Sequence, residues 1–133
     1  MLRRARPLVL LVEDNGMIRD RYAEFLQMSG FDVLTAGDGV EALDQARQSQ
    51  PDVILLDASL PRLDGWDTLR ALKGDAHTRQ SLVLMLTAHV FDEHRRRAAA
   101  EGADGFIPKP CLPAELTDEV RKALARAERK NVS

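Results

Sequence analysis

The segment Val53–Asp57, a short apolar run that ends on a carboxylate, constrains the fold of this chain more than any other feature. Four consecutive apolar residues are typical of a strand buried on both faces of a parallel sheet. Pro51 suits the entrance of such a strand, and the residues after Asp57 have the pattern of a loop. Asp57 is therefore expected at the carboxyl end of a central strand, where open α/β sheets bind their ligands. Taken alone, Asp57 could instead cap a helix or pair with a nearby arginine, because an unpaired buried carboxylate is costly.

The composition favours one globular domain. The chain has 133 residues, of which 44% are hydrophobic and 30% charged, so it is long and apolar enough to bury a core. The formal net charge of -2 argues against a general affinity for nucleic acid, so we expect no direct nucleic-acid partner. The single cysteine, Cys111, fits a reducing compartment, and no apolar run approaches the roughly 20 residues of a membrane helix. We therefore expect a cytoplasmic protein without membrane contact.

Short apolar segments alternate with helical patterns along the whole chain. The expected strands are Leu8–Val12, Phe31–Ala36, Val53–Asp57, Ser81–Leu86 and Asp104–Ile107. Helical patterns follow the potential caps Asn15, Asp38 and Asp64, run from Phe91 to Glu101, and begin again at Pro113. This alternation predicts a five-stranded parallel sheet with helices on both faces. Since no linker, repeat or low-complexity tract interrupts it, we expect a single domain over residues 1–133, with a core at about 7–127 and no output domain.

The apolar spacing also predicts which helical residues face the core. The predicted inward residues are Ile18, Tyr22, Phe25 and Leu26; Val40, Leu43 and Ala46; Trp66, Leu69 and Leu72; and Leu112, Leu116, Val120 and Leu124.

Polar residues follow the expected strands at the points where they end. They are Glu13 and Asp14 after the first strand, Asp57 after the third, Thr87 after the fourth and Lys109 after the fifth. Because the carboxyl ends of parallel strands share one edge, these side chains can converge. Three carboxylates in one cleft repel each other, and a hard divalent cation relieves that repulsion. Oxygen ligands with retained waters favour Mg²⁺.

Lys109 and Thr87 add groups to this acidic cluster that can bind phosphate oxygens. An ammonium group can hold one phosphate oxygen, and a hydroxyl can bond another. Such a site suits phosphoryl transfer, in which positioning and charge neutralisation supply most of the catalysis. Asp57 is the expected nucleophile, because carboxylates form acyl phosphates in some enzymes.

Taken together, these motifs resemble the receiver domain of two-component response regulators, and the chain is similar to chemotaxis response regulators from about Pro7 to Arg126. The matching segments are Leu11–Asn15, Pro51–Asp57, Leu60–Gly65, Thr87–Ala88 and Gly102–Pro110. Their order and spacing make the set specific. The resemblance implies an α/β, flavodoxin-like, doubly wound fold with a five-stranded parallel sheet in the order 2-1-3-4-5.

The resemblance also implies a role for each site residue. Asp57 would accept a phosphoryl group from a phosphohistidine on a sensor histidine kinase or a histidine phosphotransfer protein. Asp14 and Asp57 would bind Mg²⁺, with Glu13 acting through water and the backbone carbonyl of Ser59 completing the protein ligands.

In the same resemblance, Thr87 and Lys109 would contact the phosphoryl oxygens. Thr87 and the aromatic residue Phe106 would then move, and the face made by the fourth helix, fifth strand and fifth helix would change shape for a downstream protein effector. The protein would be a signalling switch, a monomer or a phosphorylation-dependent dimer, that catalyses only its own phosphorylation and dephosphorylation. The Lys109-Pro110 bond is typically cis in this family.

Four positions tune or depart from the common pattern. Phe106 lacks the hydroxyl of the frequent tyrosine, so a switch there would depend on packing alone. Pro108 is unusual before Lys109 and stiffens that loop. Ser59 and His89 each lie two residues after a site residue, so we expect both to influence the lifetime of the phosphate.

The residues give weaker support to three other functions. A flavodoxin-like flavin carrier needs a Ser/Thr/Gly-rich phosphate loop after the first strand, where this chain has Glu13 and Asp14. An aspartyl-phosphate phosphatase resembles a pattern with a second aspartate where Ser59 stands. A receiver-like protein that binds a partner without phosphorylation would not need the complete site.

Overall fold

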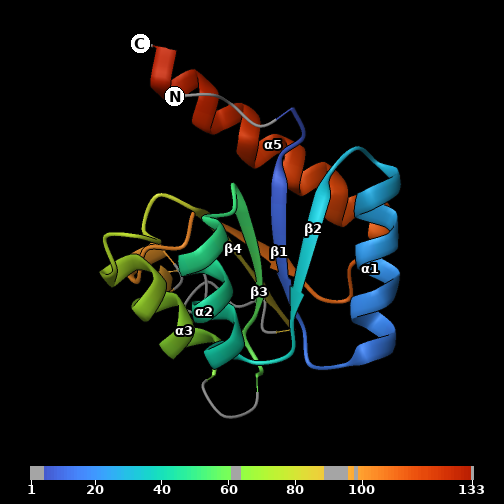
Figure 1. Cartoon of the computed structure of the whole chain (residues 1–133), viewed down its shortest axis with the longest axis horizontal. Coiled ribbons are helices and arrows are strands. Elements are labelled where there is room, and N and C mark those ends of the chain that lie inside the picture. The colour runs from blue at the N-terminus through green and yellow to red at the C-terminus, as the bar shows by residue number, and fades with distance from the viewer. Residues whose placement is uncertain (1–4, 61–63, 89–95, 98, 133) are drawn as a thin grey trace.

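The computed structural model describes residues 5–60, 64–88, 96–97 and 99–132 of the chain. Its elements are β1 (Leu8–Val12), α1 (Gly16–Met28), β2 (Asp32–Ala36), α2 (Gly39–Ser49), β3 (Val53–Asp57), α3 (Gly65–Gly74), β4 (Leu82–Thr87), β5 (Gly105–Pro108) and α5 (Pro113–Val132) (Figure 1). The helix predicted over Phe91–Glu101 lies mostly outside the described residues, although 96–97 and 99–100 are helical.

All five strands form one parallel sheet in the order β2-β1-β3-β4-β5, which confirms the predicted fold class. The chain leaves β1 toward β2 at one edge and then returns to place β3 on the other side of β1. The strand order therefore reverses between β1 and β3, and this switch point is where doubly wound sheets bind ligands. Val12 lies opposite Leu56 in the register of these two strands, so the residues that follow them emerge side by side.

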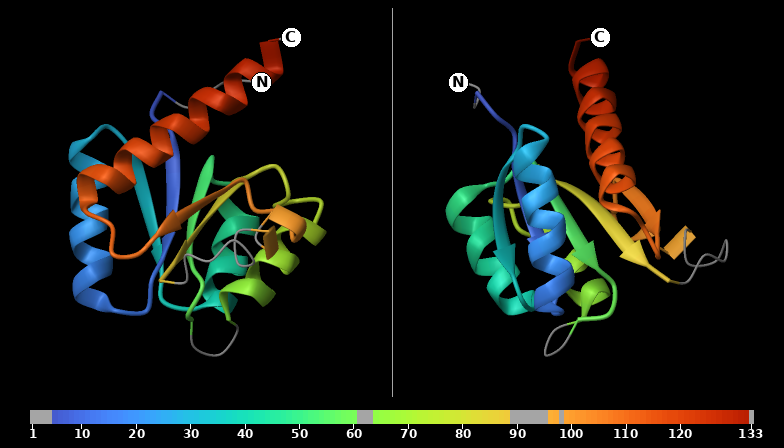
Figure 2. Two further views of the ribbon diagram at one scale, coloured as in Figure 1. Left: turned by 180° about the vertical axis from the view of Figure 1, so that it is seen from behind. Right: turned by 90° about the vertical axis from the view of Figure 1, so that its right-hand side faces the viewer.

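Helices cover both faces of the sheet. α2 and α3 lie on one face, whereas α1 and α5 lie on the other (Figures 1 and 2). Because successive strand residues point to opposite faces, β3 contributes Ile54 and Leu56 to the first core and Val53 and Leu55 to the second. Of the helices in the described part of the chain, none combines the length and the apolar content that a bilayer crossing needs.

Three helices begin at the caps that the sequence predicted. The side chains of Asn15, Asp38 and Asp64 accept hydrogen bonds from the amides of Ile18, Glu41 and Asp67 at 3.1, 2.9 and 2.8 Å, respectively. Each bond satisfies one amide that the first helical turn leaves unpaired. Gly30 follows α1 with a φ of 103°, as expected for a glycine that ends a helix.

Four of the residues predicted to face the core are exposed instead. They are Ile18 (44% exposed), Phe25 (37%), Val40 (40%) and Leu112 (66%). In α1 the inward stripe consists of Tyr22, Ala23 and Leu26, so Ile18 and Phe25 lie at its margin. In α2 the alanines Ala42 and Ala46 contact the sheet, because small side chains let the helix lie close to it. Leu112 precedes the first residue of α5 and has no place on its inner stripe.

Candidate functional site

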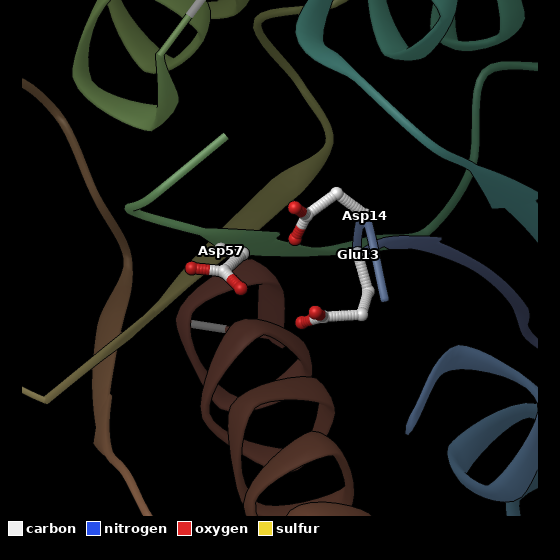
Figure 3. Close-up of side chains that lie close together, drawn as sticks. All are labelled: Glu13, Asp14 and Asp57. Carbon is white, nitrogen blue, oxygen red and sulfur yellow. The ribbon is translucent and has the colours of Figure 1, made fainter. Parts of the chain in front are cut away.

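Three carboxylates meet at the switch point of the sheet. One oxygen from each of Glu13, Asp14 and Asp57 lies within 4.8 Å of the others. Figure 3 shows the three side chains converging from the ends of β1 and β3. Glu13 and Asp57 are only 4% and 3% exposed, whereas Asp14 is exposed. The cluster therefore has a buried base and one open side.

Asp57 is held at both of its carboxylate oxygens. Lys109 Nζ lies 2.5 Å from Asp57 Oδ2, and the backbone amide of Ser59 donates to Asp57 Oδ1 at 2.8 Å. The same ammonium group lies 3.9 Å from Glu13 Oε2. Two donors on opposite oxygens fix the orientation of the carboxylate, and the cation offsets part of the negative charge of the cluster.

The pKa of Glu13 reflects its burial beside Asp57. Burial, followed by the hydrogen bond and the negative charge of Asp57, raises the pKa of Glu13 from 4.5 to about 7. The amide of Asn15, which donates to Glu13 Oε1 at 3.2 Å, and the charge of Lys109 act in the opposite direction. With only these protein groups present, Glu13 therefore keeps its proton to a higher pH than an ordinary glutamate does.

This arrangement fits a hard divalent cation. All three groups offer carboxylate oxygens, and the positive charge of an ion would offset the burial of Glu13 and its repulsion by Asp57, both of which raise the pKa of Glu13. The exposed side of the cluster, at Asp14, leaves room for the waters that Mg²⁺ retains.

The other predicted site residues differ in burial, and one of them lies outside the described residues. Thr87 is buried at the end of β4, and its carbonyl accepts the amide of Lys109 at 2.8 Å. Phe106 is half-buried on β5 and packs against the core under α2 and α3. The side chain of Ser59 is exposed, and His89 lies outside the described residues. The Lys109-Pro110 bond is cis, as the resemblance implied.

Two residues near the site have roles that the sequence interpretation missed. Gly65, the first residue of α3, donates its amide to the Ala58 carbonyl at 3.2 Å, and a Cβ at Gly65 would overlap the backbone of Asp57. The glycine stood in a matching motif, but only the structure shows which backbone it approaches. Tyr22, predicted only to face the core, donates its hydroxyl to the Cys111 carbonyl at 2.6 Å. No local sequence pattern links Tyr22 with Cys111, because the two residues are 89 positions apart.

A cleft in the described part of the molecule lies away from the acidic cluster. It is a cleft of about 260 Å³ lined by Gln80, Leu82, Asp104, Ala123, Arg126, Ala127 and Lys130. It adjoins the start of β4 and the last turns of α5, at the opposite edge of the sheet from the strand ends that carry Glu13 and Asp57. This cleft and the carboxylate cluster share no residue.

Comparison with known proteins confirms the family that the sequence motifs resemble. The family described as "response regulator receiver domain" matches residues 9–121. A curated relative, the DNA-binding dual master transcriptional regulator RpaA of Synechocystis sp., is 37% identical over 123 residues, which cover 92% of this chain and 51% of the relative. The chain therefore spans about half the length of the curated relatives it matches.

Two solved structures share the fold over most of their length. The chemotaxis protein CheY4 of Vibrio cholerae is 33% identical with a TM-score of 0.84, and the match covers 90% of this chain and 99% of that one. The receiver domain of the sensor histidine kinase PA1611 of Pseudomonas aeruginosa PAO1, solved with a magnesium ion coordinated in its active site cleft, is 29% identical. Its TM-score is 0.81, with 91% of this chain and 99% of that one covered. The chain thus belongs to the receiver domain family of two-component response regulators.

Proposed function

We propose that this receiver domain is a phospho-acceptor switch in which Asp57 takes a phosphoryl group from a phosphohistidine. The observation that carries the proposal is the environment of Asp57. A carboxylate that is 3% exposed lies at the end of the central strand, with an ammonium group 2.5 Å away and two further carboxylates within 4.8 Å. The donor would be a sensor histidine kinase or a histidine phosphotransfer protein.

The transfer would proceed by attack of an Asp57 carboxylate oxygen on phosphorus. A P–O bond forms to Asp57 while the P–N bond to the donor imidazole breaks, and the imidazole leaves with the electron pair. Lys109 would then hold an oxygen of the phosphoryl group, because its ammonium already lies at Asp57 Oδ2. The hydroxyl of Thr87, at the end of the next strand, would bond a further oxygen.

Mg²⁺ is the cofactor that we propose for this site. Its protein ligands would be Asp14, Asp57 and the Ser59 carbonyl, with Glu13 acting through water. The bound ion supplies positive charge that offsets the negative charge of the phosphoryl oxygens during transfer. The carboxylates of the chain hold that charge in place, and burial of Glu13 and Asp57 keeps their interactions strong.

The output of the switch would be a change in a protein-binding face. Thr87 and Phe106 are the proposed moving residues, and Thr87 lies opposite Pro108 in the register of β4 and β5. A shift at the end of β4 would therefore pass directly to the strand that carries Phe106. We place the effector surface on β5, α5 and the helix expected over Phe91–Glu101, and we propose a cytoplasmic monomer or phosphorylation-dependent dimer without separate turnover activity.

The expected lack of a nucleic-acid partner finds no support in the relatives. RpaA is described as DNA-binding, and the present chain covers only 51% of that protein. The net charge of -2 describes this chain alone. We therefore restrict the proposed partners to the phosphodonor and a protein effector.

We also propose that Ser59 influences how long the phosphate persists. The proposal is supported by two observations: the amide of Ser59 donates to Asp57 Oδ1, and Ser59 is exposed, so its side chain would lie near the path of an attacking water. The variant Ser59→Arg should change the decay rate of the phosphorylated protein by more than about threefold. The same expectation for His89→Ala rests on the sequence alone. Decay at the wild-type rate in both variants would contradict this role.

The direct test of the proposed function is phosphorylation by a small phosphodonor. Incubation with Mg²⁺ and acetyl phosphate should add one phosphoryl group to the intact mass of the wild type and none to that of Asp57→Asn. Asp14→Ala should lose the Mg²⁺-dependent reaction, whereas the exposed control Asp20→Ala should retain it. An unmodified wild type, or equal modification of the wild type and Asp57→Asn, would refute the proposal.

A further inference from the structure

The hydroxyl of Tyr22 makes a direct link between α1 and the segment that follows β5. It donates to the Cys111 carbonyl at 2.6 Å, and the two residues are 89 positions apart in the sequence. Both side chains are half-buried and pack against the core under α1 and α5. The link is therefore anchored on both sides by packed side chains.

Cys111 lies two residues after Lys109, so the link acts on the segment that carries the site ammonium. On its other side, the amide of Lys109 donates to the Thr87 carbonyl at 2.8 Å. The segment is thus held at two points, by β4 at Lys109 and by α1 at Cys111. From the first of these points, the side chain of Lys109 reaches Asp57 Oδ2 at 2.5 Å.

We infer that Tyr22 is a positioning residue for Lys109, and that its hydroxyl holds the Lys109–Cys111 segment so that the ammonium group stays at the phosphoryl site. This inference rests on the proposed function of Asp57 as the acceptor. Phosphoryl transfer depends on where the charged groups are placed. A small displacement of a charged group from the phosphoryl site therefore lowers the rate of transfer, even when the group itself is still present.

The protonation of Tyr22 agrees with this role. Burial raises the pKa of the Tyr22 hydroxyl, and the nearby acidic groups, Cys111 first and then Glu13 and Asp57, add to the rise. The hydroxyl therefore keeps its proton at neutral pH and remains a donor to the carbonyl. A phenylalanine at this position would fill the same space and lack only the donor.

The test compares Tyr22→Phe with the wild type in two measurements. One is the rate constant for phosphorylation by acetyl phosphate at saturating Mg²⁺, followed by intact mass. The other is the Mg²⁺ dissociation constant, measured by calorimetry without phosphodonor. The rate constant of Tyr22→Phe should fall by at least about fivefold. Its Mg²⁺ affinity should match the wild type, because Tyr22 does not hold the carboxylates.

The matched control is Arg121→Ala. Arg121 lies on α5 and donates to the Ser29 carbonyl at the end of α1 at 3.1 Å, so this variant removes a different tether of α1, one that does not involve the Lys109–Cys111 segment. Its phosphorylation rate should match the wild type. The inference is overturned if Tyr22→Phe retains the wild-type rate, if Arg121→Ala loses rate equally, or if the Mg²⁺ affinity of Tyr22→Phe falls in parallel. A wild type that accepts no phosphoryl group would refute the proposed function itself, and this inference with it.

Discussion

Lys109 Nζ lies 2.5 Å from Asp57 Oδ2 and 3.9 Å from Glu13 Oε2, so the ammonium group pairs with the proposed acceptor rather than resting midway between the two acids. In the unphosphorylated site, the nearly buried carboxylate of Asp57 is therefore in direct contact with the ammonium group of Lys109. An incoming phosphoryl group would have to replace Asp57 as the partner of this cation. We therefore expect the pair to affect both the stability of the fold and the proposed phosphoryl transfer.

Removal of the Lys109 charge should destabilise the fold. Lys109→Met leaves the buried carboxylate of Asp57 without its cation, and breaking a partly buried pair of this kind should cost about 1–3 kcal/mol. Urea unfolding at neutral pH measures the loss. The double variant Lys109→Met with Asp57→Asn should recover most of it, because neither unpaired charge remains. Equal stabilities of the single and double variants would contradict the account.

Substitution of Gly65 should disturb the segment around the acceptor. A Cβ at this position would overlap the Asp57 carbonyl oxygen and the Ala58 backbone, neither of which can rotate away. We expect Gly65→Ala to lower the free energy of unfolding by about 2 kcal/mol. Gly74→Ala, at the other end of α3, is the control, because a Cβ there meets no atom within 4 Å. A similar loss in both variants would indicate a helix effect rather than the contact with Asp57.

Without metal, the stability of the protein should fall as the pH rises through the titration of Glu13. Its pKa of about 7 in the folded protein lies above the ordinary value of 4.5, so between these values the folded protein holds a proton that the unfolded chain has released. The stabilising contribution is therefore complete below about pH 4.5 and is lost as the pH passes about 7. Unfolding in the presence of a chelator, from about pH 5 to about pH 8, measures this slope. Glu13→Gln should flatten it, and an unchanged slope would assign the effect to another group.

The fluorescence of Trp66 should report on the loop after Asp57 and on the contact of Trp66 with Arg97. The guanidinium carbon of Arg97 lies 4.3 Å from the centroid of the Trp66 ring, and Trp66 adjoins Gly65, which bonds the loop after Asp57. Since the chain has one tryptophan, its emission is a single signal. Arg97→Ala should shift that emission and remove about 0.5–1 kcal/mol of stability. Arg96→Ala, exposed and adjacent, should do neither; identical spectra for all three proteins would refute the stacking contact.

Four of the five strands were readily predictable because each is a short apolar run that ends at, or just before, a polar residue. Val53–Asp57 shows this best, since every residue of β3 is buried. The caps Asn15, Asp38 and Asp64 were predictable for a local reason, because each binds an amide three residues ahead. The convergence of Glu13, Asp14 and Asp57 followed from the parallel sheet, in which neighbouring strand ends share one edge.

The inner faces of the helices and the long-range contacts were harder to predict from the sequence. Apolar spacing locates a helical stripe only to within a residue, so Ile18 and Phe25 were placed inward although the neighbouring Tyr22, Ala23 and Leu26 form the inner face of α1. The hydrogen bond from Tyr22 to Cys111 joins residues 89 positions apart, and its existence depends on where α1 packs.

The central claim is that Asp57 carries the phosphoryl group, and reduction of the acyl phosphate with borohydride tests it most directly. Borohydride converts an aspartyl phosphate to homoserine, so peptide sequencing by mass spectrometry identifies the modified residue after treatment with Mg²⁺ and acetyl phosphate. The account predicts homoserine at position 57 and unmodified Glu13 and Asp14. Homoserine at Asp14 or at another aspartate, with Asp57 intact, would contradict it.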